Sequence, residues 1–157
     1  MANRAPTAAR ETSRGAGFDE IEMGAWAGFL RAHARLVREL DAELTARHGL
    51  ALTSYDVLIH LDRAPENRLR MSELADAVLL SRSGLTRLVA RLVNAGMVER
   101  VGCEDDQRGA WAVLTEEGGR RLREARVTHR RGVRERFLDR FSEAEQRRLG
   151  TMWERLL

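Results

Sequence analysis

The chain contains very little cysteine, and its apolar residues form no long runs. One cysteine, Cys103, is present among 157 residues, so no disulfide can form within the chain and cysteine alone cannot build a zinc site. No apolar run approaches the roughly 18 residues that span a bilayer. The amino-terminal segment lacks the apolar core of a signal peptide. These absences lead us to expect a cytoplasmic protein that does not enter a membrane.

Catalytic and metal-binding patterns are missing as well. The sequence shows no nucleophile–base pair, no glycine-rich phosphate loop and no metal-ligand spacing. Its histidines are scattered at positions 33, 48, 60 and 129. We therefore expect no enzyme activity, no cofactor and no metal site.

Lysine is absent, so all 27 basic side chains other than histidine are arginines. The planar guanidinium suits phosphate and base-edge recognition, but a GC-rich genome would favour arginine equally well. The distribution of charge is more informative than the net charge of +3. Between Ser81 and Arg100, four arginines (82, 87, 91 and 100) stand against one acid, Glu99. This local excess favours a negatively charged partner.

The amino-terminal part of the chain predicts a tail and a long helix. Residues 1–17 are small and polar with no apolar period, which predicts a disordered tail; its arginines leave open a minor-groove arm. Asp19 and Glu22 form a capping pair, and Gly49 is a stop signal. Between them, apolar residues at helical spacing predict one helix: Trp26, Phe29, Leu30, His33, Val37, Leu40 and Leu44.

Two short helices joined by a tight turn are predicted next. Thr53 with Asp56 resembles a capping pair, and a turn at residues 65–67 ends that helix before a short strand at 68–71. Ser72 is then expected to cap a helix whose inward face includes Leu79. A turn at residues 80–81 leads to a helix from Arg82 to about Ala95. This arrangement is typical of a helix-turn-helix.

A β-hairpin is predicted directly after this second helix. Gly96 ends the helix, and residues 97–101 and 110–114 have the pattern of strands on either side of a polar turn at 104–109. Arg108 is expected at the tip of this wing, where an arginine reaches the minor groove. Cys103 lies in the same hairpin and is expected to be an ordinary, partly buried thiol. Residues 50–118 thus predict a winged helix-turn-helix.

The helix that begins at Arg82 has two faces at about 100° per residue. Leu85, Leu88, Val89 and Leu92 fall on one arc. The opposite arc carries small or polar residues, as entry into a major groove requires: Arg82, Ser83, Thr86, Arg87, Ala90 and Arg91. An ordinary surface helix with a solvated face fits these angles equally well, so the hairpin that follows is what favours DNA recognition.

The carboxy-terminal part predicts two more helices with apolar stripes. Thr115 caps the first, and Ser142 with Glu145 forms a capping pair before the second. Together with the first helix they are predicted to form a helical dimerisation region, residues 18–48 and 119–157. The expected fold class is therefore α+β, mainly helical, with a winged helix-turn-helix between dimerisation helices.

With these elements in order, the chain resembles the MarR family of bacterial transcription regulators. The resemblance covers residues 19–157 and rests on a set of short motifs at matching spacing. These are Ser83, Thr86, Arg87 and Leu88 in SGLTRLVARL, the segment Gly96–Arg100, the wing segment Asp106–Gly109, and Leu114–Gly118. Each motif alone is weak, and the ordered set is specific.

The resemblance implies a homodimer that binds a pseudo-palindromic promoter site in double-stranded DNA, as a repressor in most cases, and that a small aromatic or anionic effector releases. It implies DNA contacts by Ser81, Arg82, Ser83, Thr86 and Arg87, with Arg108 in the minor groove and Asp106 orienting the wing. Arg91 is either a phosphate contact or an ion-pair partner. Trp26, His33, His60 and Trp111 either line an effector pocket or pack in the core. The alternative function is a winged-helix module that binds a protein or RNA.

Overall fold

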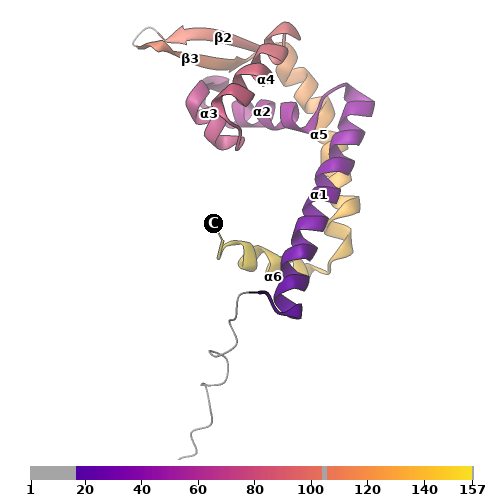
Figure 1. Cartoon of the computed structure of the whole chain (residues 1–157). Coiled ribbons are helices and arrows are strands. Elements are labelled where there is room, and N and C mark those ends of the chain that lie inside the picture. Colours follow the sequence, from indigo (N-terminus) through magenta and orange to yellow (C-terminus); the bar gives the residue numbers. More distant parts are fainter. Residues whose placement is uncertain (1–16, 104–105, 157) are drawn as a thin grey trace, which may run out of the picture. The chain divides into compact units, whose positions relative to one another are not determined.

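The computed structural model describes residues 17–103 and 106–156, without the side chains of 103 and 106–109. By its contacts the chain divides into one unit that ends at Arg35 and another that begins at Leu36. In chain order, the elements of the described part are α1 (Glu20–His48), α2 (Leu52–Arg63), η1 (Pro65–Asn67), β1 (Arg68–Arg70), α3 (Met71–Ala77), α4 (Arg82–Asn94), β2 (Val98–Cys103), β3 (Asp106–Leu114), α5 (Glu116–Arg136), η2 (Leu138–Arg140) and α6 (Glu143–Trp153) (Figure 1). This confirms the expected mainly helical α+β class.

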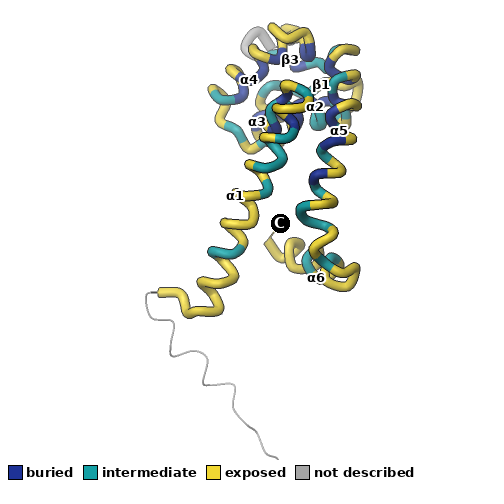
Figure 2. Tube along the Cα trace, turned by 90° about the vertical axis from the view of Figure 1, so that its right-hand side faces the viewer, coloured by how far each residue is buried: buried dark blue, intermediate teal, exposed yellow. Residues whose placement is uncertain are grey.

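The hydrophobic core lies among α2, α3, α4 and the sheet, as the dark blue segments of Figure 2 show. The end of α1 and the start of α5 also belong to it, because Leu44, Leu122 and Ala125 are fully buried. The winged helix-turn-helix is therefore completed by residues outside the range 50–118 that the sequence pattern assigned to it.

The sheet is antiparallel, with strand order β1-β3-β2. Cys103 pairs with Asp106, and the register is irregular at Gly102/Cys103. The sequence pattern placed a polar turn at 104–109, whereas the structure extends β3 back to Asp106. The hairpin projects from the helices (Figure 1). Its outer residues therefore do not alternate between apolar and polar as a strand over a core does, and backbone hydrogen bonds alone extend the strand there.

Several predicted helix ends are confirmed. The Asp19 and Glu22 side chains each accept a hydrogen bond from the other's backbone N–H, at 2.8 and 3.0 Å. Thr115 Oγ1 accepts from the Gly118 N–H at 2.9 Å, and Ser142 with Glu145 forms a capping box. Gly49 and Gly96 follow α1 and α4 with φ of 60° and 69°, which a side chain would strain.

The predicted caps of α2 and α3 are wrong, and so is the predicted inward position of Leu79. Thr53 does not cap α2, because the helix already begins at Leu52. Asp41 of α1 supplies the contact instead, and its Oδ1 accepts a hydrogen bond from the Leu52 N–H at 2.8 Å. The α3 helix begins at Met71 rather than after Ser72, with the Glu73 carboxylate accepting from the backbone N–H of Arg70. Leu79 lies in the turn after α3 and is 91% exposed, with φ of 54°.

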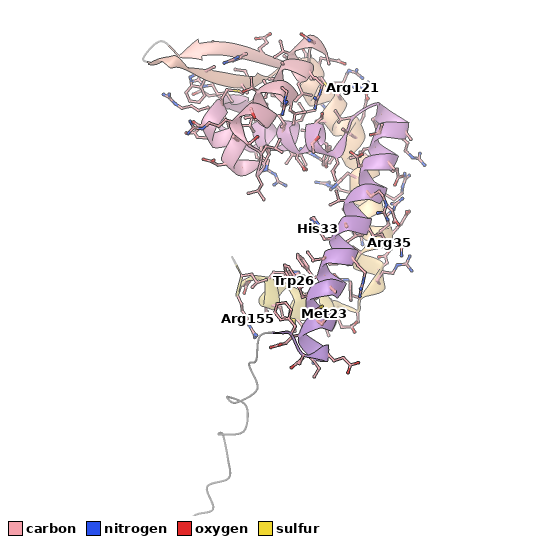
Figure 3. The ribbon with its side chains drawn as sticks, in the orientation of Figure 1. Met23, Trp26, His33, Arg35, Arg121 and Arg155 are labelled. Carbon is pink, nitrogen blue, oxygen red and sulfur yellow. The ribbon has the colours of Figure 1, made fainter. Side chains whose placement is uncertain are left out.

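Polar contacts join the end of α1 to α5. Arg121 of α5 donates to the His48 carbonyl at 2.6 Å (Figure 3), which satisfies a terminal helix carbonyl and places positive charge at the helix C-terminus. Glu43 contacts Arg131 at 2.7 Å and Arg136 at 2.9 Å. The hydrogen bond from Arg131 and the charge of Arg136 hold the pKa of the Glu43 carboxyl below its ordinary value, against the effect of burial.

Gly118 lets the first turn of α5 pack against the chain that leaves α4. A Cβ at this position would lie 2.1 Å from the Met97 carbonyl oxygen and 2.8 Å from Cδ1 of Leu114. A backbone carbonyl cannot move aside as a flexible side chain can. At the neighbouring Gly119, a Cβ would meet only the end of the Arg123 side chain, at 3.3 Å.

We expect Gly118→Ala to lower the free energy of unfolding by about 1–3 kcal/mol, the usual effect of overpacking. Gly119→Ala is the matched control, and should be neutral or stabilise the helix by up to about 1 kcal/mol. Urea unfolding followed by circular dichroism measures both. Equal effects of the two substitutions would contradict the close approach at Gly118.

Candidate nucleic-acid interface

The α4 helix has one buried and one exposed face, as its angles predict. Leu85, Leu88, Val89 and Leu92 are at most 2% exposed and face the core. The exposed face carries Arg82, Ser83, Thr86, Arg87, Ala90 and Arg91. The one larger apolar side chain beside these residues on α4 is Val93, which is 38% exposed; the rest of the face is small or polar, as approach to a DNA groove requires.

The hydroxyl groups at the start of α4 already have partners within the chain. Ser81 Oγ accepts from the Gly84 N–H at 3.1 Å and lies 3.3 Å from Ser83 Oγ. Thr86 Oγ1 donates to the Arg82 carbonyl at 2.8 Å. Ser81 is therefore the N-cap of α4, and either Ser81 or Ser83 donates in the contact between their hydroxyls. Thr86 can offer an external partner only its lone pairs and its methyl group.

The arginines of α4 are the free cations of this surface. Across residues 17–103 and 106–156, no ion pair involves Arg82, Arg87 or Arg91, and α4 contains no acidic residue. Of the two alternatives for Arg91, the ion pair is therefore not formed within the described residues. Unpaired guanidinium groups on one helix face are suited to phosphates and base edges.

A hollow of about 190 Å³ lies beside the exposed face of α4. It brings together the start of α3, the face of α4 and the second strand, and is lined by Met71, Thr86, Val89, Ala90, Val93, Asn94 and Arg100. Arg100 was not among the residues that the sequence pattern selected. Its place among the four arginines between Ser81 and Arg100 was the available signal.

The wing carries Arg108 and Asp106 in its second strand. Their backbone belongs to β3, so Arg108 is a strand residue near the end of the hairpin rather than part of a tip turn. Their side chains, like that of Cys103, lie outside the described residues. The role of Arg108 in the minor groove and of Asp106 in orienting the wing stay predictions.

A larger cavity, of about 640 Å³, lies between α2 and α5. Five of the side chains that line it are arginines, at positions 63, 126, 130, 131 and 134. Arg126 forms an ion pair with Asp62 at 2.5 Å, and Arg131 forms one with Glu43. For Arg63, Arg130 and Arg134 the described part of the chain provides no carboxylate partner. The cavity therefore has an excess of positive charge.

Two aromatic rings form part of the cavity wall. The rings of Tyr55 and His129 have their centroids 4.5 Å apart. Burial lowers the pKa of His129 below its ordinary value, against the opposing charge of Asp56, so the imidazole is neutral at neutral pH. Burial likewise raises the pKa of Tyr55, which keeps the phenol protonated. The wall thus offers neutral rings beside guanidinium groups.

The four residues proposed for an effector pocket are not gathered at this cavity. His60 of α2 and Trp111 of β3 are half-buried, and neither lines it. Arg68 and Arg70 lie over the Trp111 ring, about 5 Å from its centroid. Trp26 and His33 lie on the first part of α1, both exposed and each close to the ring of Phe29 (Figure 3).

Comparison with known proteins identifies the chain. A family model described as MarR family matches residues 48–109. The structure of Sco3205 from Streptomyces coelicolor, a MarR family transcriptional regulator in complex with DNA, is 34% identical with a TM-score of 0.85, over 90% of this chain and 89% of that one. The chain belongs to the MarR family.

Two further structures are similar, one at the level of the family and one at the level of the fold. AbsC, a MarR family transcriptional regulator from Streptomyces coelicolor, is 31% identical with a TM-score of 0.84, over 90% of this chain and 95% of that one. A mutant of MarR from E. coli complexed with operator DNA is 22% identical, with a TM-score of 0.74, over 87% of this chain and 94% of that one; it supports the fold alone. Comparison with curated protein sequences gives no significant match.

Among the described residues, no cluster of three or more histidine, cysteine or acidic side chains is arranged to hold a metal ion. Within the same residues, no helix combines the length and apolar character needed to cross a membrane.

Sequence reasoning missed the residues of the α2–α5 cavity in this MarR-family chain. Tyr55, Arg126 and Arg130 read as parts of two separate amphipathic helices. Nothing local in the sequence marks two helices as neighbours, because their contact is made by the tertiary fold. The arginine-rich stretch 120–136 was the one available signal.

Proposed function

We propose that this MarR-family transcription regulator binds a pseudo-palindromic promoter site in double-stranded DNA as a homodimer, chiefly as a repressor. The exposed face of α4, with unpaired arginines and no acidic side chain, carries this proposal. Transcription regulators are not enzymes, and the protein acts by occupying DNA in the cytoplasm, at the nucleoid, rather than by catalysis. The relative Sco3205, whose structure contains DNA, supports the same use of the fold.

In this mechanism α4 enters the major groove. Arg87 lies near the middle of the exposed face, where a guanidinium can bind O6 and N7 of a guanine together. Thr86 offers a lone pair and a methyl group to base edges, and Ser81, Ser83, Arg82 and Arg91 contact phosphates or bases at the two ends of the face. Arg108 follows the wing into the adjacent minor groove, with Asp106 orienting the hairpin.

We expect Arg87→Ala to cost about 1–3 kcal/mol of binding to DNA from directly upstream of the protein's own coding sequence, with relaxed specificity at one base pair. Arg108→Ala should instead weaken binding to all sequences to a similar degree. Fluorescence anisotropy with this duplex and its single-base variants measures both. If neither substitution changed the affinity for DNA, α4 and the wing would not be the DNA-binding elements. The alternative function, a module that binds a protein or RNA, would then be favoured.

The homodimer is proposed because both ends of the chain expose large apolar side chains. On α1 these include Ile21, Met23, Trp26 and Phe29, and after α6 they include Leu156, which is 77% exposed. Large apolar side chains left exposed in this number favour an interface with a second copy. The proposed division is thus dimerisation by residues 18–48 and 119–157 and DNA reading by 50–118, with Leu44 and Leu122 linking the two through the core.

The double variant Ile21→Asp with Leu156→Asp should be monomeric at low micromolar concentration by light scattering, where the wild type is dimeric. Both side chains are largely exposed within one chain, so the substitutions should change its unfolding free energy by less than about 0.5 kcal/mol each. Leu79→Asp makes the same change in the turn before α4 and should stay dimeric. A dimeric double variant would contradict the proposed interface.

The α2–α5 cavity is the proposed effector site. Its excess of arginine and its neutral rings, Tyr55 and His129, favour a small aromatic anion over a neutral ligand. A ligand there would contact α2, which packs in the winged core, and α5, which runs from that core into the proposed dimerisation region. Its binding energy would therefore differ between arrangements of these parts, as release from DNA requires.

Benzoate should release the protein from its upstream DNA, whereas benzamide, a neutral molecule of the same size, should not. Arg130→Gln should raise the required benzoate concentration about tenfold or more, because a hydrogen bond to a charged group contributes about 1.5–3 kcal/mol. Arg148→Gln on α6 is the matched control. Release by both ligands alike, or by neither, would contradict an anion site in this cavity.

A further inference from the structure

Trp111 lies in a cluster with two arginines on the outer face of the sheet. The register pairs Arg70 with Trp111 and Leu69 with Ala112. Ala112 is fully buried, so the alternate positions Arg68, Arg70 and Trp111 share the opposite face of the sheet. The guanidinium carbons of Arg68 and Arg70 lie 4.9 and 5.0 Å from the centroid of the Trp111 ring.

The two arginines of this cluster differ in their charge environment. Arg68 forms an exposed ion pair with Glu66 at 2.7 Å, so a carboxylate already accompanies its charge. For Arg70, no ion pair forms within residues 17–103 and 106–156. Its guanidinium is attracted to the face of the indole, which limits the conformations of an otherwise flexible side chain. Arg70 is therefore an unneutralised cation held in a defined position.

Arg70 is the sequence neighbour of a residue that borders the proposed DNA-binding face. It directly precedes Met71, the first residue of α3, and Met71 lines the hollow that contains Thr86, Ala90 and Arg100. The exposed face of α4 and the start of α3 therefore meet at this hollow. A DNA strand beside α4 would pass the N-terminus of α3, where a side chain with a fixed positive charge meets the phosphate backbone.

We propose that Arg70 is an additional DNA phosphate contact next to the recognition helix, and that Trp111 is a positioning residue that holds it there. This rests on the proposed DNA-binding function and adds to it a contact outside α4 and the wing. Because phosphates are the same at every base pair, this contact adds affinity without sequence preference. Trp111 is accordingly part of the nucleic-acid interface rather than of an effector pocket.

The test measures the salt dependence of binding with the full-length protein. Two duplexes serve as probes: the DNA directly upstream of its own coding sequence, and an unrelated duplex of equal length. Losing one phosphate contact should make the negative slope of log K against log salt shallower by about 0.9, and should weaken binding about fivefold at 0.15 M NaCl. We expect Arg70→Gln to do this on both duplexes. Arg148→Gln removes the same charge from α6 and should leave the slope unchanged.

A double-mutant cycle separates positioning by Trp111 from a general structural effect. In the wild-type background, Trp111→Leu should make the slope shallower, as Arg70→Gln does, and Trp111→Phe, which keeps a ring, should restore most of it. In the Arg70→Gln background, Trp111→Leu should have no further effect on affinity, because the contact is already gone. Equal losses in both backgrounds would show that Trp111 acts only through the stability of the sheet.

The proposed Arg70 contact can be disproved independently of the proposed DNA-binding function. If Arg70→Gln leaves affinity and slope unchanged while Arg87→Ala still weakens binding to the upstream duplex, the Arg70 contact is wrong and DNA recognition by α4 stands. If the wild-type protein binds neither duplex, both proposals fall together.

Discussion

The burial of one face of α4 is the constraint on which the rest of this structure depends. Leu85, Leu88, Val89 and Leu92 are almost completely removed from solvent, and each fully buried side chain of this size contributes about 1.5–3 kcal/mol. Rotating the helix by one residue would expose part of this seam, so the core fixes the direction of the opposite face. The arginines gain their orientation from apolar packing on the other side of the helix.

The same core also connects the proposed DNA-reading part to the long helices. The last turns of α1 and the first turns of α5 contribute Leu44, Leu122 and Ala125 to it. Polar contacts of Arg121 with the His48 carbonyl and of Glu43 with Arg131 and Arg136 hold these helices together. The arginine-lined cavity lies along the same stretch of α5 and includes Arg131, so a ligand there contacts a helix that packs in the winged core. This gives the proposed effector a physical route to the DNA-binding face.

Positive charge extends beyond the recognition helix along surfaces that different elements supply. Arg100 comes from β2, Arg70 from the junction of β1 and α3, and Arg108 from β3. Cation–π contact with Trp111 holds the Arg70 side chain, and pairing with Ala112 fixes the place of Arg100 in its strand. In the proposed DNA complex, affinity for phosphates is distributed over several elements, whereas base recognition is concentrated on the exposed residues of α4.

The sequence by itself determined what depends on neighbours a few residues away. The two faces of α4, the caps at Asp19, Thr115 and Ser142, and the glycine ends of α1 and α4 all follow from helical spacing and local hydrogen bonds. The ordered motifs were enough to indicate the family. The tertiary structure alone decided the cap of α2 by Asp41, the exposure of Leu79, the contact of Tyr55 with His129 and the arginines over Trp111. Such features join segments remote in the chain or depend on what surrounds them, and folding rather than local pattern creates those surroundings.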